Sequence, residues 1–119
     1  MGVLQIVGFF TKEEETLMMS NVLPGSNAQR WHPDFADVIV GGVDKSTGID
    51  AVAAHFGWDV KQTMAFGDGG NDIGMLRHVG CGIAMGNAND EVKAAADYVT
   101  DSVDEDGIFK ALKHFGIIE

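Results

Sequence analysis

Two aspartates stand four residues apart in a glycine-rich turn that follows a short apolar run. Residues 66–72 are Phe-Gly-Asp-Gly-Gly-Asn-Asp, so Asp68 and Asp72 flank the turn. In open parallel sheets, ligands bind outside the carboxyl ends of the strands, and we expect both carboxylates at that edge. Neighbouring carboxylates repel each other unless a cation lies beside them, and Mg²⁺ commonly takes one or two carboxylates together with substrate phosphate. The pattern therefore predicts a magnesium site. The alternative interpretation is an ordinary turn in which Asp72 caps a helix.

Lys45 is the second candidate for chemistry. It follows an apolar run and the Gly41-Gly42 turn and comes just before a predicted helix, so we expect it at the same edge of the sheet. A point positive charge at that edge can hold a phosphate oxygen and balance nearby carboxylates. The chain has only 8 basic residues, and a lysine gains nothing from the dipole at a helix N-terminus. The alternative is a solvated lysine in the first turn of a helix.

Other known motifs fail on their spacing. Residues 41–46 lack the last glycine of a P-loop, and residues 67–72 lack the third glycine of a dinucleotide-binding fingerprint. The acidic run 104–107 resembles a calcium loop, but Ser102 and Lys113 occupy the first and last ligand positions. None of the four histidines has the spacing of a metal-binding HExxH motif.

The predicted elements explain how these residues would be positioned. After residue 33, strands and helices alternate at short spacing, which is typical of an α/β fold with a mainly parallel, helix-covered sheet. The break around His32-Pro33 divides the chain into two expected units, residues 1–32 and residues 33–119. We predict strands over residues 3–10, 28–31, 37–40, 63–66, 82–85 and 98–100, and helices over 11–23, 47–56, 72–79, 91–96 and 107–115.

Composition excludes several classes of partner. The formal net charge is −10, with acidic residues spread along the chain, so we expect neither nucleic acid nor anionic lipid as a partner. No apolar run approaches the ~20 residues of a membrane span, and the N-terminus has no signal-peptide pattern. Cys81 is the single cysteine and can form no internal disulfide. A reducing, cytoplasmic setting is the expectation.

Five collinear stretches resemble the Cof-type sugar-phosphate phosphatases of the haloacid dehalogenase superfamily. They are Lys45-Ser46-Thr47-Gly48, residues 65–76, Ala84-Met85-Gly86-Asn87-Ala88, residues 92–100 and Asp104-Glu105-Asp106-Gly107. The resemblance covers about residues 28–118. Residues 1–27 are similar, more weakly, to the last strand and helix of that group's inserted cap domain.

The resemblance implies a Rossmann-like core that hydrolyses a phosphorylated small molecule through an aspartyl-phosphate, with Mg²⁺. In that family the lysine matching Lys45 steadies the nucleophile and the phosphate. The aspartate matching Asp68 is a metal ligand, and the one matching Asp72 ligates the metal or orients its water shell. By the same resemblance, Asn71 lies near the bound phosphate.

One departure from the family pattern limits this expectation. The family's nucleophile and general acid/base lie in an Asp-x-Asp motif near the start of the protein, and no such motif follows a predicted strand in this sequence. Residues 104–106 fit Asp-x-Asp by letters only, because they precede the last helix. We therefore expect the chain to correspond to the C-terminal part of such a hydrolase, with the nucleophile absent, and to be inactive alone.

A different class of function stays open. In the family's sheet, the strand matching residues 63–66 pairs with the nucleophile strand, so its edge would be exposed here. Exposed strand edges with apolar faces tend to pair with another chain. The alternative function is therefore a non-catalytic assembly or binding module, and we expect a homo-oligomer formed through this edge.

Overall fold

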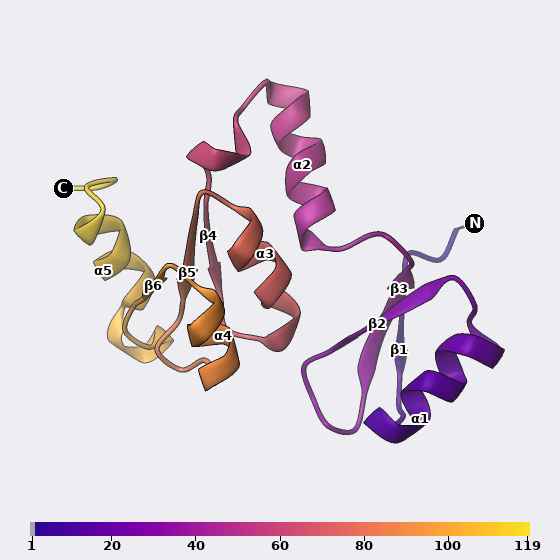
Figure 1. Cartoon of the computed structure of the whole chain (residues 1–119). Helices are drawn as coiled ribbons and strands as arrows, with labels where there is room; N and C mark the ends of the chain where they lie inside the picture. The colour runs from indigo at the N-terminus through magenta and orange to yellow at the C-terminus, as the bar shows by residue number, and fades with distance from the viewer. Residues whose placement is uncertain (1) are drawn as a thin grey trace.

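The helices and strands follow the sequence pattern closely in a computed structural model that describes residues 2–119 (Figure 1). The strands are β1 (Gln5–Gly8), β2 (Ser26–Arg30), β3 (Ala36–Val40), β4 (Met64–Gly67), β5 (Cys81–Ala84) and β6 (Tyr98–Val99). The α-helices are α1 (Lys12–Leu17), α2 (Lys45–Phe56), α3 (Ile73–His78), α4 (Asp90–Ala95) and α5 (Gly107–His114). A π-helical turn, Met18–Val22, continues α1, and short 3₁₀ turns cover Val60–Gln62, Gly70–Asp72 and Val103–Glu105. The strands form two separate sheets.

The antiparallel sheet has the strand order β1-β3-β2. Val38 of β3 lies opposite Ile6 on one side and Ala28 on the other. The central strand is therefore β3, and the sheet continues past residue 32, where the sequence analysis ended the first unit. The short loop between β2 and β3 reverses the chain direction. The mainly parallel sheet that the alternating pattern predicts is therefore the second sheet, and this first sheet is antiparallel.

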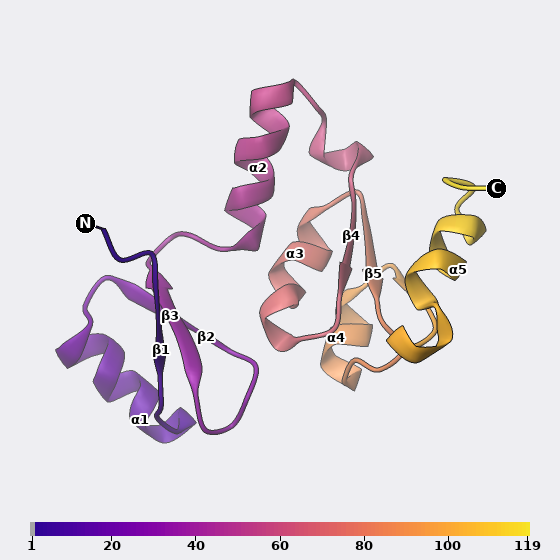
Figure 2. The ribbon, with the colours of Figure 1, turned by 180° about the vertical axis from the view of Figure 1, so that it is seen from behind.

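Helix α1 and the turn after it cover one face of the antiparallel sheet, while the other face points toward the rest of the molecule (Figures 1 and 2). Thr11 caps α1 as expected: the Glu14 N–H donates to its hydroxyl, and its own N–H donates to the Glu14 carboxylate at 2.9 Å. The buried cluster on the covered face contains Phe10, Ala36 and Val38. Alternation along β3 leaves Asp37 and Ile39 on the open face.

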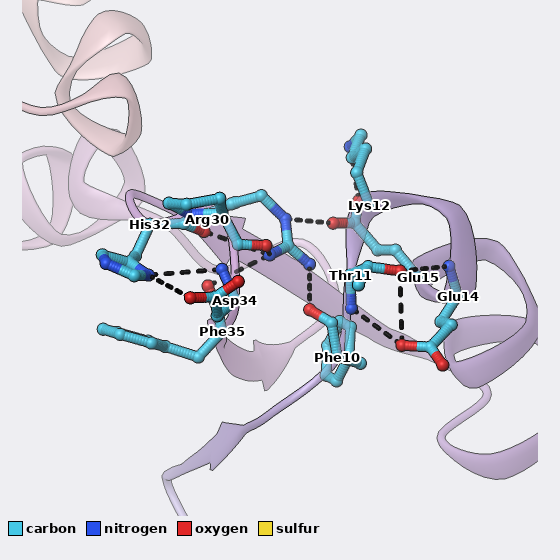
Figure 3. A network of polar contacts seen from close by, with 10 residues as sticks. Phe10, Thr11, Lys12, Glu14, Glu15, Arg30, His32, Asp34 and Phe35 are labelled. Carbon is cyan, nitrogen blue, oxygen red and sulfur yellow. Dashed lines mark hydrogen bonds and ion pairs between the residues drawn. The ribbon is translucent and has the colours of Figure 1, made fainter.

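Arg30 secures the loop between β2 and β3 (Figure 3). Its guanidinium donates to the Glu15 carboxylate at 3.0 Å and to the carbonyls of Phe10 and Phe35 at 3.0 and 3.2 Å. It also donates to the carbonyl of Pro33 and lies over the Phe10 ring. Burial would raise the pKa of Glu15, but the hydrogen bonds from Lys12 and Arg30 outweigh it and lower that pKa. One planar donor thus ties α1, the sheet and the loop together.

The connection from the antiparallel sheet to α2 is short. Gly41 donates its N–H to the Gly25 carbonyl at 2.8 Å, and Val43 donates to the Val40 carbonyl at 3.3 Å, so residues 40–43 form a turn tied to the end of the antiparallel sheet. Asp44 begins α2, because its carboxylate accepts from the Thr47 N–H and the Thr47 hydroxyl accepts from its own N–H. This capping box starts the helix at Lys45, two residues before the predicted start.

The parallel sheet has the order β4-β5-β6, as the alternating pattern predicted. Helices α3 and α4 lie on one side of it and α5 on the other (Figures 1 and 2). Leu76, Ala84, Ala88 and Val92 form the buried cluster between α3, α4 and β5. Within residues 2–119, β4 has a paired strand on one side only. No helix in this described part is long and apolar enough to cross a membrane.

Candidate active site

The carboxyl ends of β4 and β5 meet the first residue of α2 at one edge of the parallel sheet. Asp68 follows β4 directly, Asn87 follows β5 after two residues, and Lys45 opens α2. A cavity of about 440 Å³ at this edge is lined by Lys45, Asp68, Asp72 and Asn87. Three of the four predicted site residues therefore share a single cavity.

Asp72 is a buried carboxylate whose hydrogen bonds all come from neighbouring residues of the site. Its side chain is held by an ion pair from the Lys45 ammonium to Oδ1. Its Oδ2 accepts the backbone N–H groups of Asp68 and Gly69, each at 3.0 Å. Burial alone would raise the pKa of Asp72, but the hydrogen bonds from Lys45, Gly69 and Asp68 outweigh it and lower that pKa. Asp72 is thus an ionised anchor for the turn and for Lys45, and it makes no capping bond to α3.

Gly67 makes this arrangement possible. A Cβ at Gly67 would lie 2.6 Å from the Cβ of Asp72, closer than real carbon atoms approach. Because the last residue of β4 has no side chain, Asp72 can fold back beneath the turn. The glycine-rich composition of residues 66–72 therefore has a specific steric cause.

Asp68 is the carboxylate that remains available. Its Oδ2 has a long contact of 3.4 Å with the Asn87 amide nitrogen, and the residue is exposed at the cavity. Asn87 is itself held in place, because its Oδ1 accepts the Val103 N–H at 3.0 Å. Sequence reasoning did not assign Asn87 to the site. The signal that could have identified it is its place in the Gly86-Asn87 turn after a predicted strand.

Asn71 lies in a different part of the site from Asp68. It lines a second cavity of about 210 Å³ between the parallel sheet and the open face of the antiparallel sheet. Lys45 lines both cavities and so belongs to both parts of the site. The antiparallel sheet contributes Gln5, Gln29, Asp37 and Ile39 to the second cavity, none of which the sequence analysis singled out.

The donor set suits a hard cation held partly by its substrate. Asp68 offers free carboxylate oxygens, whereas both oxygens of Asp72 already accept hydrogen bonds. Residues 2–119 contain no cluster of three or more potential metal ligands. One or two carboxylates with waters and substrate phosphate are a common Mg²⁺ environment. The residues therefore fit Mg²⁺: Asp68 would be the direct ligand, while Asp72 shapes the turn.

Comparison with known proteins agrees with this geometry. Residues 2–112 match the family model of haloacid dehalogenase-like hydrolases. YkrA of Bacillus subtilis (strain 168) is 42% identical over 117 residues, covering 98% of this chain and 45% of YkrA. The 5-amino-6-(5-phospho-D-ribitylamino)uracil phosphatase YcsE of the same organism is 42% identical over 83 residues, covering 70% of this chain and 33% of YcsE.

Solved structures give the same result. The HAD subclass IIB sugar phosphatase BT4131 is 54% identical to this chain, with a TM-score of 0.91. The match covers 99% of this chain and 45% of BT4131. The chain thus spans less than half the length of these relatives, and the antiparallel and parallel sheets both lie within the matched region.

Proposed function

The chain belongs to the haloacid dehalogenase-like hydrolases, a family of phosphatases, and from this premise we propose that it forms the metal- and phosphate-binding part of a magnesium-dependent phosphomonoesterase. The observation that carries the proposal is the Asp72 anchor. It holds Lys45 and the turn after β4 together and leaves the Asp68 carboxylate free at the carboxyl edge of the sheet.

Each residue has a distinct part in this proposal. Lys45 has three N–H donors, one of which bonds Asp72, so two are left for phosphate oxygens. Asn71 and Asn87 would add neutral amide donors on either side of the phosphate. Asp68 would hold Mg²⁺, which when bound neutralises negative charge on the transferring phosphoryl group. Asp72 fixes the Lys45 ammonium in the position where it can meet the phosphate.

The metal assignment predicts a localised effect of a divalent cation. Titration of ¹⁵N-labelled protein with Mn²⁺ as a paramagnetic probe should broaden the amide signals of Asp68 and Asn87 first. Asp68→Asn should weaken this effect at least about tenfold, because it removes a charge-assisted contact. The matched control is Asp90→Asn, an exposed aspartate in the first turn of α4. The assignment would be contradicted if the broadening persisted in Asp68→Asn and was lost in Asp90→Asn.

We also propose that the 119-residue chain does not hydrolyse phosphate esters alone. Covalent phosphoryl transfer needs an attacking carboxylate, and no Asp-x-Asp stretch follows any of the observed strands. Turnover of p-nitrophenyl phosphate with Mg²⁺ should therefore be absent. Activity that Asp68→Asn abolishes would show that the chain supplies its own nucleophile.

The proposed substrate class is a sugar phosphate or a related phosphorylated polyol. BT4131 is named a sugar phosphatase, and the substrate in the name of YcsE carries a 5-phospho-D-ribityl group. The second cavity, beside Lys45, is lined in part by the polar side chains of Gln5, Gln29 and Asp37 from the antiparallel sheet. A cytoplasmic setting stays a prediction based on the lone Cys81.

A second candidate function, self-assembly, is favoured by the surface beside β4. An apolar groove of about 500 Å³ lies between α2 and α3 at the start of this strand, and we name it the β4 groove. It is lined chiefly by Ile49, Val52, Trp58, Met64, Met75 and Val79. Val52 and Trp58 are more than half exposed. We propose that a second copy of the chain can cover this groove.

A further inference from the structure

The open face of the antiparallel sheet presents polar side chains directly to the phosphate-binding residues. The register places Gln29 opposite Asp37 and Gln5 opposite Ile39, and all four line the cavity that also contains Lys45 and Asn71. The covered face of the same sheet carries the apolar residues Ala36 and Val38. Polar residues therefore occupy the face turned toward Lys45, where a purely structural contact would not require them.

The position of Lys45 relates the two cavities to the two ends of a phosphate ester. Lys45 lines the cavity of Asp68 and Asp72 on one side and the cavity of Gln29 and Asp37 on the other, and its ammonium bonds Asp72. A phosphate held at Lys45 and Asp68 would direct its ester oxygen, and the alcohol attached to it, into the second cavity. The volume of about 210 Å³ lies below the roughly 300–1,000 Å³ of typical ligand pockets, so the cavity suits a small alcohol.

Asp37 is the carboxylate in this cavity that is free to recognise a ligand. Its Oδ2 accepts the indole N–H of Trp31 at 3.2 Å, and its Oδ1 accepts no hydrogen bond from the described residues. The other carboxylate, that of Asp44, is used in the cap of α2. Trp31 is held in turn by edge-on packing against Phe35, with ring centroids 4.8 Å apart. The Asp37 side chain is therefore positioned with one oxygen left for a donor.

We propose that Asp37, with Gln29 beside it, selects the leaving group of the phosphatase reaction. Asp37 accepts hydrogen bonds from hydroxyl groups of a small polyol, and Gln29 both donates and accepts. The negative charge of Asp37 excludes alcohols that carry a second phosphate or a carboxylate, because like charges brought together are unfavourable. This inference rests on the proposed function and adds residues that decide between substrates.

Binding measured by NMR on the 119-residue chain tests the inference without requiring turnover. Three probes are titrated with Mg²⁺ present: orthophosphate, glucose 6-phosphate and 3-phosphoglycerate. Orthophosphate should shift the amide signals of Lys45, Asn71 and Asn87 but leave those of Gln29 and Asp37 unchanged. Glucose 6-phosphate should also shift those of Gln29 and Asp37, and it should bind more tightly than 3-phosphoglycerate.

The variant Asp37→Asn should leave orthophosphate affinity unchanged. It should weaken glucose 6-phosphate and strengthen 3-phosphoglycerate, each by about tenfold, as expected for one hydrogen bond or repulsion involving a charged group. Trp31→Phe, which keeps an aromatic ring but removes the donor to Asp37, should reduce the same selectivity. Asp34→Asn, an exposed neighbour in the loop before β3, is the matched control and should change none of the affinities.

The outcomes separate the inference from the proposed function. Unchanged selectivity in Asp37→Asn, with orthophosphate still bound at Lys45, would overturn the inference alone. An equal change for all three probes would also overturn it, because Asp37 would then act on the phosphate and not on the alcohol. Absence of orthophosphate binding by the unmodified chain would overturn the proposed function and the inference together.

Discussion

Asp72 shows how one buried carboxylate can organise a site without facing the ligand itself. It is 5% exposed, and a charge at that depth is tolerated only when it is well bonded. Two backbone N–H groups and one ammonium meet that need. The same bonds fix the turn after β4 and set the direction of Lys45. At the scale of single residues, Asp72 is the anchor, and Asp68 is the residue that we propose as the metal ligand.

The lowered pKa of Asp72 predicts a specific pH dependence of stability. The unfolded carboxyl titrates near 3.8 and the folded one at lower pH, so its contribution is full above the unfolded value and is lost as pH falls through the folded value. We expect Asp72→Asn to lower the free energy of unfolding by about 1–3 kcal/mol at neutral pH. Below pH 3.8 the difference between the two proteins should shrink.

Urea denaturation at neutral pH and at acid pH measures this difference directly. Asp104→Asn, in the exposed turn before α5, is the control and should change stability little at either pH. A stability difference for Asp72→Asn that is constant across the acid range would show that the lowered pKa does not contribute to folding.

Sequence reasoning brought the charged candidate residues to one edge of the sheet because charge, glycine and strand ends leave strong local signals. Lys45, Asp68 and Asp72 share one cavity, as the pattern indicated. It could not separate the roles of the two aspartates, because these depend on which backbone N–H groups each carboxylate meets. Gln29 and Asp37 left no signal, since their proximity to Lys45 results from the packing of one sheet against another.

At the scale of elements, strand β5 and helix α2 each contain a glycine, and the space around the two glycines differs. Gly82 in β5 is buried, and a Cβ there would lie 2.1 Å from the Leu76 carbonyl oxygen. Gly48 lies inside α2, where an added Cβ would have open space around it, with no neighbouring atom within 4 Å. The first glycine permits α3 to approach β5, while the second has no packing role.

These two glycines give a paired prediction. Gly82→Ala should destabilise the protein by about 1–3 kcal/mol, because the backbone of α3 must move away from β5. Gly48→Ala should stabilise it by roughly 0.5–1 kcal/mol, because alanine loses less conformational freedom in a helix. Urea titrations followed by Trp58 fluorescence measure both changes. Equal changes in the free energy of unfolding for the two substitutions would show that the contact between Gly82 and α3 does not exclude a Cβ.

The elements themselves were predicted with different success in the two halves of the chain. Each predicted strand and helix is present, with ends shifted by a few residues. The parallel order β4-β5-β6 follows from alternation along the chain, a local property. The antiparallel order β1-β3-β2 depends on pairing between distant segments, and no local pattern indicated that β3 would join the earlier strands.

At the scale of the whole molecule, the two sheets give an extended shape. The radius of gyration is 16.2 Å, compared with about 13–14 Å for a compact domain of this length. An extended shape leaves much surface uncovered, including the β4 groove. The formal net charge of −10 opposes contact between copies at low ionic strength.

Self-association should therefore depend on salt. Raising NaCl from about 0.01 M to about 1 M shortens the Debye length from about 30 Å to about 3 Å and removes most of the repulsion. We expect the mass measured by light scattering to increase over this range. Met64→Lys, which puts a charge into the β4 groove, should keep the chain monomeric. Val99→Lys on the opposite edge strand, β6, should behave like the unmodified chain, and a monomer at every salt concentration would contradict self-assembly.

The connection between β3 and α2 has a consequence for motion. Val43 is bonded back to the antiparallel sheet through its N–H, and Asp44 is bonded forward into α2 through its own. Any rotation between the two sheets that keeps these bonds must occur about the few backbone bonds between those two amides. We expect the antiparallel sheet to rotate as a rigid body about Val43 while Lys45 and Asp72 stay together. The backbone torsions of Val43 would then set how long a ligand is retained beside Lys45.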